Sequence, residues 1–136
     1  MTSMRYVPSA IVAATLIFLS TACGGVSDPS SNSVQDFMAT ISPGEVRTHE
    51  FDVSKRNGEY SVTITAMTPD PATVLTMYLG QIANSACTAV SQPTFAVLNR
   101  IALSGFVQQG HYCIAVYDSQ GLVTRPETYT LHVSHP

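Results

Sequence analysis

Seven side chains of this 136-residue chain belong to the types that commonly act as nucleophiles, general bases or metal ligands. They are the histidines and cysteines: His49, His111, His132, His135, Cys23, Cys87 and Cys113. Hydrolysis by a serine nucleophile needs a G-x-S-x-G turn, or a serine or cysteine beside a histidine and an acid. Leu103-Ser104-Gly105 lacks the first glycine of that turn, and we expect it at the end of a strand. The sequence therefore predicts no catalytic residue.

Metal binding is not predicted either. The chain has no H-E-x-x-H helix and no cysteine-rich zinc pattern. His132 and His135 are three residues apart, which places them on opposite faces of a strand, so we expect surface histidines. The acidic residues of the first half lack the spacing of a calcium loop and favour a solvated surface. They are Asp28, Asp36, Glu45, Glu50 and Asp52.

Tyrosine rings can bind sugars or proteins because they combine a large contact area with a polar tip. The candidates are Tyr78, Tyr112, Tyr117 and Tyr129. Tyr112 and Tyr129 alternate with aliphatic residues, which favours the core. Tyr117 falls on the face opposite Tyr112, and it is the residue that we predict for a surface contact.

The N-terminal segment has the three parts of a secretory signal. Arg5 precedes an apolar run over Ala10–Leu19, and small residues lead to Cys23. This order resembles the export signal of a bacterial lipoprotein, which is cut before a cysteine that then carries acyl chains. An ordinary signal peptide is the alternative, since lipoprotein signals usually carry leucine where this chain has Ser20. The run is shorter than the roughly 20 apolar residues of a membrane span.

Lipid on Cys23 would place the protein in the bacterial cell envelope, facing the periplasm or the cell surface. The residue after the cysteine is Gly24 and not the aspartate that retains some lipoproteins at the inner membrane, which favours the outer membrane. Residues 24–33 are small and polar and are typical of a flexible tether. We therefore predict a signal peptide over 1–22, the lipid-bearing cysteine and tether over 23–34, and one domain over 35–136.

With the cysteine at position 23 lipidated, Cys87 and Cys113 remain as a pair in an oxidising compartment. We predict a disulfide between them. Closing a loop of roughly 25 residues would stabilise the fold by about 3 kcal/mol. Two buried free thiols, or a redox pair without the C-x-x-C spacing, are the alternatives.

The charge balance argues against nucleic acid as a partner. Loss of residues 1–22 removes Arg5 and leaves five basic and nine acidic residues. The basic residues are scattered, whereas a nucleic-acid footprint is clustered and basic.

Short alternating runs separated by turn residues predict an antiparallel all-β domain. The clearest are Val46–Val53, Glu59–Thr68, Thr73–Gln81, Gly110–Asp118 and Glu127–Ser134. Seven or eight such strands predict two packed sheets in a jelly-roll-like sandwich.

Two details of that prediction concern pairing and faces. Asn57-Gly58 is a turn signal, so Val46–Val53 is expected to form a hairpin with Glu59–Thr68. In the second run, Tyr60, Val62, Ile64 and Ala66 are expected on one face. Phe95–Leu103 fits either a strand or a short helix.

Four strand motifs occur in order: Phe51-Asp-Val53, Ser61-Val-Thr-Ile-Thr-Ala66, Gly110-His-Tyr112 and Tyr129-Thr-Leu-His-Val133. Over residues 35–136 this order resembles the bacterial pre-peptidase C-terminal domains, which are β-sandwich modules of secreted proteins. The resemblance implies the fold, and the usual partner peptidase domain is absent from this sequence.

These observations lead to the hypothesis of a non-catalytic, lipid-anchored accessory module without a cofactor. Its partners would be the membrane, through lipid on Cys23, and an envelope protein or glycan. The alternative is a structural or assembly lipoprotein that pairs with a partner through its edge strands. An enzyme ranks third.

Overall fold

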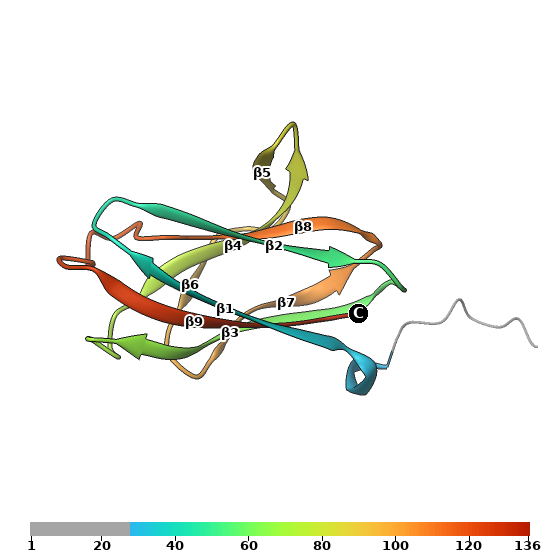
Figure 1. The fold of residues 1–136 in the computed structure, drawn as a ribbon, viewed down its shortest axis with the longest axis horizontal. Coiled ribbons are helices and arrows are strands. Elements are labelled where there is room, and N and C mark those ends of the chain that lie inside the picture. The colour runs from blue at the N-terminus through green and yellow to red at the C-terminus, as the bar shows by residue number, and fades with distance from the viewer. Residues whose placement is uncertain (1–27) are drawn as a thin grey trace, which may run out of the picture.

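The computed structural model of the chain describes residues 28–136. The predicted signal peptide and Cys23 lie outside the described residues. Within residues 28–136 the chain forms two antiparallel sheets packed face to face, which confirms the predicted all-β sandwich (Figure 1).

A short 3-10 helix and nine strands make up the described domain. Their bounds are η1 (Pro29–Ser31), β1 (Ser33–Ile41), β2 (Val46–Val53), β3 (Gly58–Thr68), β4 (Leu75–Ala83), β5 (Ala86–Ala89), β6 (Thr94–Ala96), β7 (Ile101–Val107), β8 (Gly110–Tyr117) and β9 (Glu127–His135). The predicted count of seven or eight was too low. Strands β5 and β6 are too short for an alternating pattern to reveal them.

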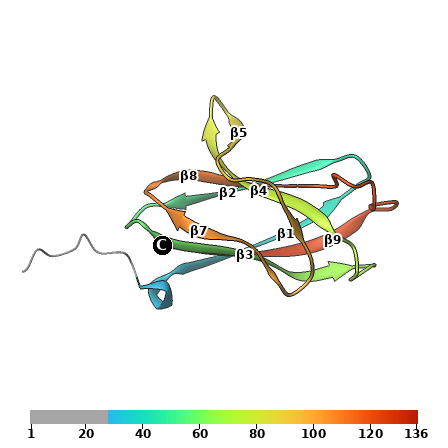
Figure 2. The same cartoon turned by 180° about the vertical axis from the view of Figure 1, so that it is seen from behind.

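The strand order is that of a jelly roll. One sheet runs β1-β9-β3-β7, and the other runs β2-β8-β4-β5 with β6 beside β4. With β6 left aside, the first strand pairs with the last, the second with the last but one, and so on inward to β4 and β5. Figures 1 and 2 show the two layers, with the β4–β5 hairpin projecting from one of them.

The core lies between the alternating faces of these sheets. In β8 and β9, which are central strands, the predicted inward residues are all buried. They are Tyr112, Ile114, Val116, Tyr129, Leu131 and Val133. Each alternate residue must point away from the core, so the outer faces of the two sheets are left for other contacts.

The predicted hairpin between β2 and β3 was wrong. Strand β2 pairs with β8, whereas β3 pairs with β7 and β9 in the other sheet. The positive backbone φ angles of a tight hairpin occur instead at Asn84 and Ser85, between β4 and β5. The loop over residues 54–57 therefore carries the chain from one sheet to the other.

One face assignment in β3 was also wrong. The register of β3 against β9 shifts between Ile64 and Ala66. Such a bulge inserts one residue and reverses the faces that follow it. Met67 is consequently 4% exposed, and Ala66 lies on the outer face.

The ambiguous stretch Phe95–Leu103 contains no helix and is not a single strand. Strand β6 ends at Ala96, and β7 begins at Ile101. Between them Asn99 has a φ of 58°, which interrupts the extended backbone. Ser104 lies inside β7 and not at a strand end as predicted.

The domain begins slightly before residue 35. Strand β1 starts at Ser33, and η1 precedes it. The Asn32 Nδ2 group donates hydrogen bonds to the Glu59 carbonyl at 2.9 Å and to the Ser134 hydroxyl at 3.2 Å. The last residues of the predicted tether therefore pack against β3 and β9.

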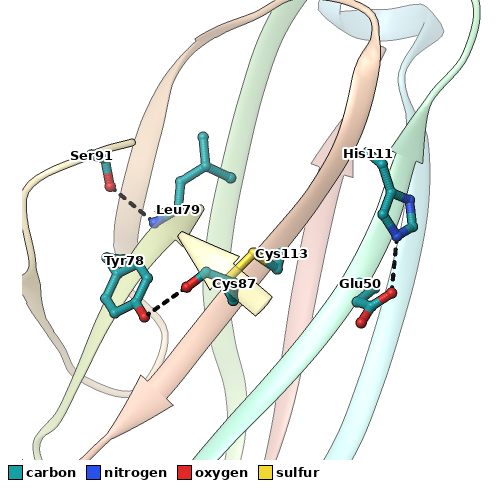
Figure 3. The surroundings of a disulfide bond; sticks show 7 residues. All are labelled: Glu50, Tyr78, Leu79, Cys87, Ser91, His111 and Cys113. Carbon is teal, nitrogen blue, oxygen red and sulfur yellow. Dashed lines mark hydrogen bonds and ion pairs between the residues drawn. A yellow bond between two sulfur atoms is a disulfide. The ribbon is translucent and has the colours of Figure 1, made fainter. Parts of the chain in front are cut away.

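The predicted disulfide between Cys87 and Cys113 is present (Figure 3). It joins the short strand β5 to β8 on the outer face of the five-stranded sheet. Gly80 of β4 lies beneath it, and a Cβ atom at this position would lie 2.7 Å from Cys87 Sγ and 2.8 Å from Cys113 Sγ. The glycine therefore provides the space through which the disulfide crosses β4.

We predict that Gly80→Ala destabilises the oxidised protein by about 1–3 kcal/mol, because the methyl group has no room. Urea unfolding measures this, first in the wild-type background and then with Cys87→Ala and Cys113→Ala. The penalty should shrink in the second background, where only the Thr88 carbonyl, 2.8 Å from the added Cβ, still obstructs it. Equal penalties in both backgrounds would show that the disulfide does not require the glycine.

Candidate functional site

Tyr117 lies at the end of β8, on the outer face of the five-stranded sheet. Its ring meets the ring of Tyr78 on β4, with centroids 6.2 Å apart and the planes at 64°. Both rings are half-buried. Directly opposite Tyr117 on β2 is Val46, which is 59% exposed. The structure thus brings together one predicted contact residue, a second tyrosine and an exposed aliphatic side chain.

The two rings meet edge to face and do not form a coplanar platform. Such an arrangement presents a ring face and a phenol hydroxyl side by side, which suits a partner with both apolar and hydrogen-bonding groups. The other two tyrosines considered for this role, Tyr112 and Tyr129, are in the core as predicted.

The disulfide holds the sheet together beside this pair. The Tyr78 hydroxyl donates to the Cys87 carbonyl at 3.5 Å (Figure 3). Next to Tyr78 on β4, the Leu79 backbone N–H donates to the hydroxyl of Ser91, which follows β5, at 2.9 Å. Tyr78 is therefore attached to a covalently closed segment of the sheet.

The loop that follows Tyr117 is organised by Asp118. Its carboxylate accepts from the backbone N–H groups of Gln120 at 3.1 Å and Val123 at 2.8 Å. Desolvation acts to raise the pKa of this carboxyl, but the hydrogen bonds from the loop backbone outweigh it and the pKa is lowered. Asp118 thus stays ionised and keeps the loop closed next to Tyr117.

His111 lies on the same outer face, near the start of β8. Its Nδ1 donates to Asp52 Oδ1 at 2.6 Å, and its Nε2 donates to Glu50 Oε2 at 2.9 Å (Figure 3 shows the latter). These two hydrogen bonds raise the pKa of His111. In its protonated form the imidazole links two carboxylates of β2 to β8.

The other histidines have structural contacts. His49 Nε2 and the Tyr129 hydroxyl are 2.7 Å apart and form a hydrogen bond at the side of the core, where burial, and then the charge of Arg47, lower the pKa of His49. His132 pairs with Asp36 at 2.7 Å across β9 and β1.

The prediction of a surface position was wrong for His135, which is 3% exposed. As the last residue of β9 it follows the inward alternation of that strand, and its ring lies 4.9 Å from that of Phe51.

The acidic residues of the first half are dispersed. Asp36, Glu50 and Asp52 contact the histidines described above, Glu45 pairs with Arg47 at 2.7 Å, and Asp28 caps η1. Over residues 28–136, no group of three or more histidine, cysteine or acidic side chains has an arrangement that could hold a metal ion. The described residues also contain no helix with the length and apolar character of a membrane span.

No family model matches the chain, and no curated protein matches it. The resemblance to pre-peptidase C-terminal domains therefore stays a prediction, as does the lipoprotein signal.

The cluster around His111 was not foreseen from the sequence. Glu50 and Asp52 alternate on one strand, which signals a shared outer face. Their histidine partner comes from β8, about 60 residues later in the chain, and only the β2–β8 register reveals it.

We predict that His111 makes stability depend on pH. A raised folded-state pKa means that the stabilisation is fully present below about pH 6.5, the unfolded histidine value, and is lost as pH rises through the folded value. His111→Gln should therefore lower the unfolding midpoint most at about pH 5.5 and least at about pH 8. The opposite contribution of His49, whose pKa is lowered, is common to both proteins and cancels in the difference. A difference in unfolding midpoint between the two proteins that does not change with pH would contradict the raised pKa of His111.

Proposed function

We propose that this protein is a non-catalytic, lipid-anchored binding module of the bacterial cell envelope. The observation that carries the proposal is the Tyr78–Tyr117 pair. The core is already filled by Tyr60, Tyr112 and Tyr129, so these two rings are not needed to close it. Half-buried tyrosines on an outer sheet face, beside an exposed valine, are a composition that favours contact with a partner.

The position of Tyr117 along β8 supports this role. Strand β8 runs from Gly110 to Tyr117, roughly 23 Å of extended chain. Its start lies beside the loop over residues 54–57, because Gln109 Nε2 donates to the Ser54 and Lys55 carbonyls at 3.1 and 2.9 Å. That end of the sandwich also holds η1, where the chain arrives from the anchor. Tyr117 is at the far end, where a partner in the envelope can reach it.

The chemistry of this face suits a protein or a glycan. The ring faces and Val46 offer apolar contact, and the phenol groups offer hydrogen bonds. The five basic residues of the described part are not clustered on this face, so nucleic acid is not among the proposed partners.

The anchor is the second part of the proposal. Each buried methylene of an acyl chain contributes about 0.8 kcal/mol, and several chains on Cys23 would hold the protein durably at the membrane. The outer membrane is the proposed location, with the domain facing the periplasm or the cell surface.

We predict that the protein expressed in a bacterial host is acylated and begins at Cys23. Intact mass should show the acylated mature chain, and the protein should partition with membranes. Cys23→Ser should be soluble and unacylated, while the Cys87–Cys113 disulfide persists in both. A soluble, unacylated wild type would contradict the anchor and leave a secreted or periplasmic binder.

We predict that Tyr117 contacts the partner. If the partner is a protein, a photo-crosslinking residue at position 117 should capture it in cells. If the partner is a glycan, the purified protein should sediment with peptidoglycan, and Tyr117→Ala should abolish this sedimentation. The matched control is position 106, because Phe106 is also exposed, at 53%, but lies on β7 in the other sheet. Equal results at both positions would contradict the proposed face. A turnover activity abolished by replacing one polar residue would contradict the non-catalytic role.

Strand β1 favours a second candidate, assembly through an edge strand. Among the described strands it pairs with β9 alone. The Thr40 carbonyl accepts from Arg47 Nε at 2.8 Å and so points away from β9. By alternation, the backbone groups of Val34 and Met38 point the same way, and such an edge can accept another strand. Capture from position 38 rather than 117 would favour this candidate.

A further inference from the structure

We infer that the end of the sandwich next to η1 docks on the surface of the membrane, with Phe106 at the lipid interface. The inference rests on the proposed anchor at Cys23 and adds an orientation of the domain. Three groups of residues from distant parts of the chain carry it. They are the helix η1, the loop over residues 54–57, and the end of β7.

The first observation is an exposed apolar area beside η1. Pro29 of η1 shares the lining of a shallow hollow of about 520 Å³ with Ile101 and Phe106 of β7. Ile101 is 65% exposed and Phe106 is 53% exposed. Asn32 bonds to the Glu59 carbonyl, and Glu59 is the cross-strand partner of Phe106. The segment that leads to the anchor is thus fastened next to exposed apolar side chains.

The second observation is a pair of cations at the same end. Lys55 and Arg56 are exposed, and they line a second hollow together with Ser31 of η1. Within residues 28–136, neither cation has an ion-pair partner, whereas Arg47 and Arg125 each pair with a glutamate. Cations close to a bilayer are attracted to anionic headgroups.

The length of chain before η1 identifies the occupant. Cys23 precedes Asp28 by five residues, which span at most about 18 Å when fully extended. A lipid on Cys23 therefore keeps this end of the domain within that distance of the bilayer. Among residues 28–136, this surface carries an exposed phenylalanine and two cations without an ion-pair partner. Because it is tethered so closely, the lipid surface is its nearest partner.

Acidic groups moderate the charge at this end. Asp28 Oδ1 accepts from the Ser30 backbone N–H at 2.9 Å, and Glu59 lies beside Phe106. Asp52, two residues before the loop over 54–57, pairs with His111 near the start of β8. The end as a whole therefore carries no excess of positive charge. We expect the ring of Phe106 to supply most of the contact, and Lys55 and Arg56 to add a preference for anionic lipid.

The test uses fluorescence, because the chain contains no tryptophan. The acylated mature protein carrying Phe106→Trp is reconstituted into vesicles of phosphatidylethanolamine and phosphatidylglycerol. Phe95→Trp is the matched control, since that residue is similarly exposed, at 59%, but lies on β6 at the Tyr117 end of the sandwich. We expect a blue-shifted emission for the tryptophan at 106, with quenching by brominated lipid. The tryptophan at 95 should show neither effect and should be quenched by aqueous iodide.

Three results would overturn the inference, and they are distinguishable. Vesicle-bound protein with both tryptophans equally open to iodide would refute docking while leaving the anchor intact. Failure to associate with vesicles would refute the anchor as well. A tryptophan at 106 shielded from iodide but not quenched by brominated lipid would indicate that protein covers this end.

A second variant tests the cations without changing the reporter. Replacing Lys55 and Arg56 with glutamine, in the Phe106→Trp background, should reduce the blue shift on vesicles that contain phosphatidylglycerol. The shift on vesicles of phosphatidylcholine alone should not change. An identical shift for both proteins on both kinds of vesicle would remove these cations from the inference.

Discussion

Two sheets that each have one apolar face can be stable only when those faces cover one another, and this constraint shapes the whole domain. It requires strict alternation in the central strands, which β8 and β9 provide through Tyr112 and Ile114 on one side and Tyr129 and Leu131 on the other. The same alternation sends every second side chain outward. On β8, Tyr112 points into the core, so His111 and Tyr117, which have the opposite parity along the strand, point to the outer face.

The outer face of the five-stranded sheet has its own covalent reinforcement. A four-residue strand such as β5 buries little apolar surface, and its hairpin projects from the layer in Figure 1. The disulfide attaches it to β8, and Gly80 leaves the space for the crossing. Cys113 is fully buried although it points outward, because β5 covers it. The hairpin thereby becomes part of the surface on which Tyr78 lies.

Local patterns were sufficient to predict five of the longer strands, β2, β3, β4, β8 and β9, but not which strands pair. Residue alternation predicted Val46–Val53 with the bounds that β2 has, and the number of cysteines predicted the disulfide. Such patterns failed where the deciding contact was distant in the chain. The β2–β3 hairpin was wrong because β2 pairs with β8, and the His111 cluster was missed for the same reason. The bulge after Ile64, which exposes Ala66, also depends on pairing with β9.

The nested pairing explains why separate segments meet at one end of the sandwich. Because β1 and β9 are antiparallel, the start of β1 lies beside the end of β9, and the β2–β8 pair likewise brings the loop over residues 54–57 beside the start of β8. Helix η1, Lys55 and the turn at Gln109 therefore share an end. Tyr117 must then lie at the opposite end of the sandwich, because β8 starts at the η1 end and Tyr117 is its last residue. In the proposed arrangement, the topology itself separates the surface that faces the membrane from the surface that faces a partner.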